Sequence, residues 1–155
     1  MTIPTARARL ARIDLPDFGM PDASPDLPAS IYPRRLAGLR ERAVARGYDQ
    51  LVVYADREHS ANLSYLTGFD PRFEEALLVV GRDGDPAVLV GNECYGMAGA
   101  APLPMRRHRF ADLSLPGQPR DRSRPLAEIL AEEGIGPGSR VGVVGWKPYA
   151  RRDLM

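Results

Sequence analysis

Residues 76–90 read ALLVVGRDGDPAVLV, and this stretch decides the fold class. Two apolar runs, Ala76 to Val80 and Ala87 to Val90, flank the polar residues 82–85. Asp83-Gly84 between such runs is a strong signal for a two-residue hairpin, because these residue types tolerate the positive φ angles that the turn requires. The sequence therefore predicts two neighbouring antiparallel strands.

Upstream of the hairpin, the pattern predicts a helix, a buried strand and a short helical segment. Because proline is favoured in the first turn of a helix, we expect Pro33 to lie in the first turn of a helix that ends at Gly47. Residues 51–55, LVVYA, are typical of a strand buried on both faces. Residues 59–67 favour one or two helical turns that stop at Gly68, before a loop over 69–75. The stripe of the first helix is Leu36, Leu39, Ala43 and Val44.

Downstream, residues 94–101 predict a weak helix, residues 105–111 an edge strand and residues 113–122 a loop. Pro125 should open a helix that stops at Gly134, and residues 141–146 predict another buried strand. The inward side chains of that helix would be Leu126, Ile129 and Leu130. The expected architecture is α/β, with a mixed sheet of five or six strands and flanking helices.

Composition limits the class of protein. The 155 residues are 44% hydrophobic and 26% charged, which suits one globular domain with a real core. The net charge of +1 provides no global field toward nucleic acid or anionic lipid. No apolar run reaches the roughly 18 residues of a membrane helix. We expect no nucleic-acid partner, no membrane and a cytoplasmic location.

The N-terminal segment differs from the rest of the chain. Six of the 15 prolines fall in the first 33 residues, and residues 14–30 show no apolar period. We interpret 1–31 as a proline-rich lead-in that wraps a surface or stays mobile, with a short helix possible over 5–13.

Motif inspection finds no complete active site. The glycines of 134–138 follow a helix and precede a strand, which is the reverse of a phosphate-binding loop. His59 and His108 do not have the spacing of metal ligands. His59 is interpreted as an exposed residue that caps the helical segment after it, or as a residue that contacts a ligand. His108 is interpreted as an exposed residue of a strand. The acidic pairs Glu74-Glu75 and Glu132-Glu133 do not form dyads by sequence alone. Cys94 favours a buried structural thiol over a nucleophile.

The order of several segments resembles the N-terminal domain of the creatinase/prolidase/aminopeptidase P family of Xaa-Pro peptidases. The resemblance covers residues 32–149, and its most specific mark is NLSYLTGF at 62–69. The other segments are YPRRL at 32–36, GYD at 47–49 before LVV at 51–53, ALLVV at 76–80 and VGVVGW at 141–146.

This resemblance implies a ribonuclease-H-like α/β domain that is not itself catalytic. Residues 150–155 would be the start of a linker. The catalytic domain of the family, which holds two divalent metal ions (Mn, Co or Zn), would follow this linker. We therefore expect no catalytic residue, metal ligand or cofactor in this chain, and a truncated product that is inactive alone.

The resemblance also implies a role at the mouth of the active site. In such proteins the N-terminal domain supports a homo-oligomer, here expected to be a dimer, and lends loop residues to the site that binds the peptide substrate. The matching candidates are Phe69, Arg72 and Phe73, with Tyr65 beneath them and His59 nearby. The alternatives are a surface loop that Phe69 and Phe73 merely anchor, and a self-standing binding or regulatory module without peptidase activity.

Overall fold

A five-stranded sheet organises the chain, of which the computed structural model describes residues 11–20, 22–23 and 27–145. Its spatial order is β4-β3-β2-β1-β5. Two pairs, β1·β2 and β2·β3, are antiparallel, whereas β1·β5 and β3·β4 are parallel. The mixed sheet predicted from the sequence is therefore confirmed. The strands are β1 (Gln50–Ala55), β2 (Ala76–Val80), β3 (Ala87–Val90), β4 (Arg106–Arg109) and β5 (Val141–Val144).

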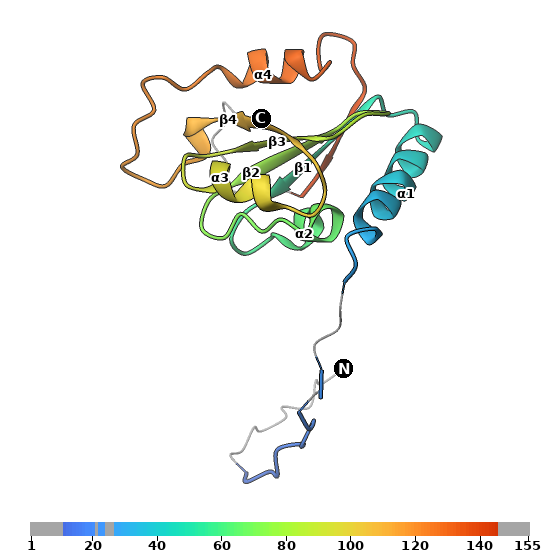
Figure 1. Ribbon diagram of the computed structural model, residues 1–155, viewed down its shortest axis with the longest axis vertical. Coiled ribbons are helices and arrows are strands. Elements are labelled where there is room, and N and C mark those ends of the chain that lie inside the picture. Colours follow the sequence, from blue (N-terminus) through green and yellow to red (C-terminus); the bar gives the residue numbers. More distant parts are fainter. Residues whose placement is uncertain (1–10, 21, 24–26, 146–155) are drawn as a thin grey trace, which may run out of the picture.

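Helices cover both faces of this sheet (Figure 1). Helices α1 (Ile31–Ala45), α2 (Ala61–Thr67) and α3 (Cys94–Met97) lie on one face, and α4 (Leu126–Glu132) lies on the other. Pro33 falls in the first turn of α1, Gly68 ends α2, and Pro125 immediately precedes α4, as the sequence predicts. The weak helix expected over 94–101 is α3 followed by a 3₁₀ turn at Ala98–Ala100.

Two apolar clusters, one on each face of the sheet, form the core. The larger joins α1, α2 and α3 to the sheet around Leu36, Val53, Leu63, Leu78 and Cys94. The smaller joins α4 to the opposite face through Ile129, Val79, Leu89 and Phe110. Because β-strand side chains alternate between faces, neighbours such as Leu78 and Val79 serve different clusters.

Strands β2 and β3 are antiparallel as predicted, but the prediction of a two-residue turn between them is wrong. The last paired residues are Val79 and Ala87, so that residues 81–86 form a longer connection. Arg40 of α1 explains this length, since its guanidinium donates to the carbonyl oxygens of Gly81 at 2.9 Å and of Gly84 at 2.6 Å. A tight turn would not present these carbonyls to α1.

Both edge strands depart from expectation. Strand β5 is not buried on both faces, because among the described strands it pairs with β1 alone and its Val143 is 62% exposed. Strand β4 ends at Arg109, earlier than the expected 105–111, since a 3₁₀ turn forms at Ala111–Leu113. Trp146, the last residue of the expected strand, lies outside the described residues.

His108 is not the exposed strand residue that its arginine neighbours suggested. Its side chain is only 17% exposed, and its Nε2 lies 2.6 Å from Oε1 of Glu133. Arg106 also donates to Glu133, whose side chain is largely shielded from solvent. Burial alone would raise the pKa of Glu133, but the hydrogen bonds from Arg106 and His108 outweigh it and hold that pKa below its ordinary value. This cluster fastens the end of α4 to the edge strand.

The N-terminal lead-in forms no helix or strand at its described residues 11–20, 22–23 and 27–30, whereas its last residue, Ile31, begins α1. Residues 11–13 of the short helix considered for 5–13 are not helical, and residues 5–10 lie outside the described part. Among the helices that the structure describes, none is long and apolar enough to cross a membrane.

Candidate functional site

The candidate loop begins at Gly68, where α2 ends in a left-handed conformation with φ of 74°. A Cβ atom at this position would lie 2.8 Å from Cδ of Pro102 and 2.9 Å from Cζ of Tyr32. Both the backbone angle and the available space therefore require glycine. Gly68 thus sets the direction in which the loop leaves the core.

Phe69 lies beneath this loop. Its side chain is only 4% exposed, and its N–H donates to Oγ1 of Thr67 at 3.0 Å. The Thr67 hydroxyl in turn donates to the carbonyl of Leu63 at 2.7 Å, and Ser64 Oγ donates to the Phe69 carbonyl at 3.1 Å. The structure thus places Phe69 as an anchor whose ring contributes to the wall of a cavity.

Arg72 stands at the exposed turn of the loop and has a φ of 60°. This left-handed conformation costs a non-glycine residue roughly 1–2 kcal/mol. Asp70 offsets part of that cost by accepting the Arg72 N–H at 2.8 Å. Arg72 lines a cavity of about 310 Å³ together with Phe69, Asp70 and Met97. The loop therefore holds a charged side chain beside a partly apolar hollow.

The far end of the loop is fixed from within the core. The buried carboxylate of Glu74 accepts the backbone N–H of Glu93 at 3.1 Å and of Cys94 at 2.9 Å. The Cys94 thiol donates to the carbonyl of Pro71 at 2.9 Å. Between these attachments Phe73 is 51% exposed. The loop thus presents Phe73 and Arg72 from a backbone held at both ends.

The electrostatics of this attachment favour a structural role for Cys94. Burial, and after it the hydrogen bond and charge of Glu74, raise the pKa of the thiol to about 12. Cys94 is thus a protonated donor at neutral pH, since the thiolate is the nucleophilic form of cysteine. Burial also raises the pKa of Glu74. The buried structural thiol expected from the sequence agrees with these contacts.

The structure does not bring the remaining candidates to the same place. His59 is exposed in the connection before α2, where its Nδ1 lies 2.9 Å from Oδ1 of Asp56. It does not cap α2, whose N-cap residue is Ser60. Tyr65 lies on α2 and is 56% exposed, but it lines a different cavity from Phe69 and Arg72. Two separate surfaces therefore carry the candidate residues.

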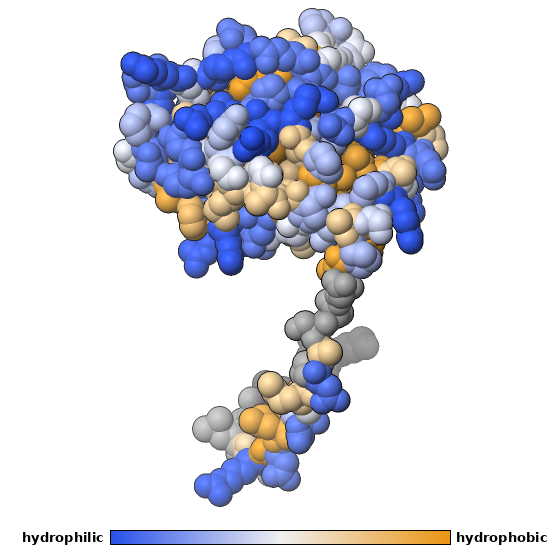
Figure 2. Space-filling view, viewed as in Figure 1, coloured by the Kyte–Doolittle hydropathy of each residue, from blue (hydrophilic) through white to orange (hydrophobic). Residues whose placement is uncertain are grey.

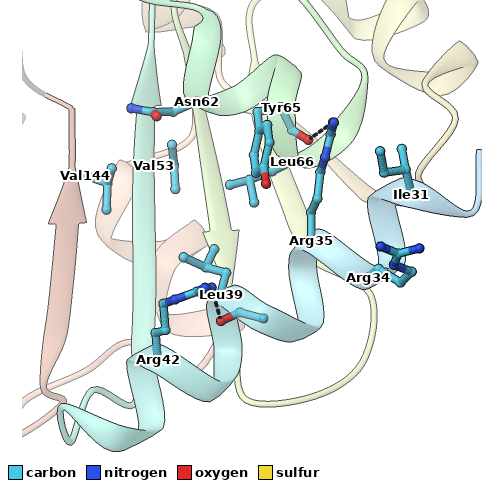
Figure 3. Close-up of a pocket in the computed structure, with 11 residues that line it drawn as sticks. Ile31, Arg34, Arg35, Leu39, Arg42, Val53, Asn62, Tyr65, Leu66 and Val144 are labelled. Atoms are coloured by element: carbon cyan, nitrogen blue, oxygen red, sulfur yellow. Dashed lines mark hydrogen bonds between the residues drawn. The ribbon is translucent and has the colours of Figure 1, made fainter. Parts of the chain in front are cut away.

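This second hollow, called here the arginine cavity, measures about 520 Å³ and lies between α1, α2, β1 and β5 (Figure 3). Three arginines of α1 line it, and none of the acidic side chains that the structure describes does. Arg35 stacks on Tyr65, 4.0 Å from the ring centroid, and donates to the Tyr65 carbonyl at 2.8 Å. The lining consists of the basic or polar Arg34, Arg35, Arg42, Asn62 and Tyr65, the apolar Ile31, Leu39, Val53, Leu66 and Val144, and Gly38.

Sequence reasoning missed the arginines of this cavity. Arg35, Leu39 and Arg42 recur at the i, i+4, i+7 spacing of one helix face, which was the available signal. The other walls come from β1, α2 and β5, which lie further along the sequence, so the helix pattern alone could not show a cavity. Within the described residues, His, Cys, Asp and Glu form no group of three or more that could hold a metal ion.

Comparison with known families now identifies the domain. The family model of the creatinase/prolidase N-terminal domain matches residues 35–152, most of the chain. The chain belongs to this family. None of the curated proteins matches it. The creatinase/prolidase resemblance and the α/β fold class expected from the sequence are both confirmed.

Several solved structures are similar to this chain at low sequence identity. A dipeptidase PepE from Mycobacterium ulcerans is 20% identical, with a TM-score of 0.45; the match covers 58% of this chain but only 24% of that one. A proline dipeptidase from Streptococcus agalactiae is 18% identical, with a TM-score of 0.45 over 75% of this chain and 95% of that one. The N-terminal domain of a cytoplasmic peptidase PepQ from Mycobacterium tuberculosis is 15% identical, with a TM-score of 0.43. The match covers 72% of this chain and 91% of that one.

Proposed function

We propose that this chain acts as the non-catalytic N-terminal domain of a metal-dependent hydrolase of the Xaa-Pro peptidase type. Its membership of the creatinase/prolidase N-terminal family supports this role. The catalytic domain of the same protein would follow this domain and would be its partner. That domain would hold two divalent ions, Mn, Co or Zn, which activate water. The described residues do not fit such a pair of ions, so we assign them no step of the reaction.

In this proposal the chain shapes the substrate pocket and helps to assemble a homo-oligomer, a dimer in the simplest case. The observation that carries the first role is the loop held at both ends, with Arg72 and Phe73 exposed between its attachments. A guanidinium suits a peptide carboxylate, and an aromatic ring covers an apolar side chain. Because the backbone is already fixed, the loop loses little conformational entropy when a peptide docks.

Substitution of Arg72 in the enzyme that carries this domain tests the proposal. Arg72→Ala should lower kcat/KM for an Xaa-Pro peptide by about tenfold or more, since a hydrogen bond to a charged group contributes roughly 1.5–3 kcal/mol. The melting temperature should not fall, because alanine removes no core contact at this exposed position. Arg122→Ala, which removes an equal charge from another exposed loop position, is the matched control.

An unchanged kcat/KM in the Arg72→Ala enzyme would remove this loop from the substrate pocket. If the natural protein proved to have no hydrolase domain, the alternative of a self-standing binding or regulatory module would replace the proposal. The expected cytoplasmic location stays a prediction, which cell fractionation can check.

A further inference from the structure

The described N-terminal residues 11–20, called here the arm, expose an unusual amount of apolar surface. Ile13, Leu15, Phe18 and Met20 are between 76% and 92% exposed. Figure 1 shows the arm running away from the body, and Figure 2 shows apolar side chains along it. Four large exposed apolar side chains within ten residues indicate a surface that binds a partner.

Acidic residues alternate with these apolar ones. Asp14 lies between Ile13 and Leu15, Asp17 precedes Phe18, and Arg12 is the one basic residue of the arm. The arm therefore combines four large apolar side chains with two carboxylates and one guanidinium, which leaves it an excess of negative charge.

The arginine cavity has the complementary chemistry. Its floor is apolar, and Arg34, Arg35 and Arg42 surround that floor without an acidic side chain among the lining residues. Arg35 is engaged with Tyr65 and Arg42 with the carbonyl of Gly38, but each guanidinium has further N–H donors. The volume of about 520 Å³ falls within the range of pockets that bind compact ligands.

The arm does not use its own cavity in the described conformation. Among residues 11–20, 22–23 and 27–145, the hydrogen bond that involves the arm is internal, from the Gly19 N–H to Asp17. Every copy of the chain carries one arm and one cavity. In a closed two-fold dimer, each arm could bind in the cavity of the other copy, so that both arms and both cavities are occupied.

We propose that the arm of one copy docks in the arginine cavity of a second copy, so that two chains exchange arms. The apolar side chains of the arm cover Leu39, Leu66 and Val144, while Asp14 and Asp17 meet the arginines on α1. This inference rests on the homo-oligomer part of the proposed function and deepens it, and it does not depend on peptidase activity.

Sedimentation equilibrium of the full chain tests the exchange over a range of micromolar concentrations. The wild type should dimerise, and Leu15→Ala/Phe18→Ala should raise the dimer dissociation constant at least tenfold. Arg34→Glu/Arg42→Glu should have the same effect while circular dichroism and melting temperature stay near those of the wild type. Val143→Ala should leave the dimer unchanged, because Val143 is exposed on the opposite face of the sheet.

Charge reversal keeps the test specific. Asp14→Arg/Asp17→Arg should weaken the wild-type dimer and should restore dimerisation when mixed with the Arg34→Glu/Arg42→Glu chain. Arg122→Glu controls for a change of net charge outside the cavity.

Three outcomes would overturn the exchange. A dimer unaffected by arm and cavity variants would leave the homo-oligomer in place and remove the arm from it. A monomer at every concentration would contradict both the exchange and the proposed homo-oligomer. A spin label on the arm of a monomer that broadens the signals of its own α1 would show that the arm docks within one chain.

Discussion

Gly68→Ala is the substitution whose effect the structure defines most sharply. The new side chain would have to adopt a φ of 74°, which costs a non-glycine residue roughly 1–2 kcal/mol. Its Cβ would also lie 2.8 Å from Cδ of Pro102 and 2.9 Å from Cζ of Tyr32. Overpacking of this kind costs about 1–3 kcal/mol. We therefore expect a total loss of about 2–5 kcal/mol in the free energy of unfolding.

Gly138→Ala separates the two contributions. Gly138 has a φ of 88° in the turn where the Ser139 N–H donates to the Gly136 carbonyl at 3.0 Å, and no atom would lie within 4 Å of a new Cβ. In this control variant the free energy of unfolding should fall only by the conformational cost, roughly 1–2 kcal/mol. The difference between the two variants measures how tightly Gly68 is packed under the loop.

Urea unfolding followed by circular dichroism provides both free energies from the same buffer. The m value should stay constant, because the surface exposed on unfolding does not change. If Gly68→Ala proved no more destabilising than Gly138→Ala, then Pro102 and Tyr32 would not confine the end of α2. The argument that the loop direction is fixed by packing would then be refuted.

Three further predictions concern other parts of the fold. Glu133→Gln should destabilise the chain at pH 7 by about 1–3 kcal/mol. Because the pKa of Glu133 is lowered, this difference should shrink as the pH falls below the ordinary pKa of glutamate. A difference in unfolding free energy between wild type and variant that stays constant with pH, measured in urea, would contradict this expectation. Arg40→Met should lower the free energy of unfolding by about 1–3 kcal/mol and increase hydrogen exchange in residues 81–86, whereas unchanged exchange would separate Arg40 from the β2–β3 connection. Cys94 should react slowly with iodoacetamide at pH 8 in the folded chain and quickly in urea; equal rates would contradict its burial.

Local sequence signals predicted the elements that depend on neighbouring residues. Gly68 and Gly134 mark helix ends, and the runs 51–55 and 76–80 are strands because their apolar, β-branched residues suit the interior of a sheet. The order of these segments was enough to indicate the family. By contrast, the Asp83-Gly84 signal predicted the wrong turn because Arg40, more than 40 residues earlier, holds the carbonyls of a longer connection.

The candidate site was predictable only in part, for a similar reason. The loop after Gly68 was identified from its resemblance to a family, but its rigidity depends on Glu74 and Cys94 meeting across the core. The arginine cavity needs four elements, α1, α2, β1 and β5, which converge only in the folded chain. His108 shows the same limit, since its arginine neighbours suggest exposure whereas Glu133 beyond α4 partly buries it.

Hydrolysis of an Xaa-Pro peptide by the purified 155-residue chain is the most direct test of the central claim. The chain would be supplied in turn with Mn²⁺, Co²⁺ and Zn²⁺, and the released amino acid would be measured against each metal alone. We predict no release above the metal controls, because the proposal assigns all chemistry to a separate catalytic domain. Metal-dependent turnover that follows the concentration of this chain would contradict the account.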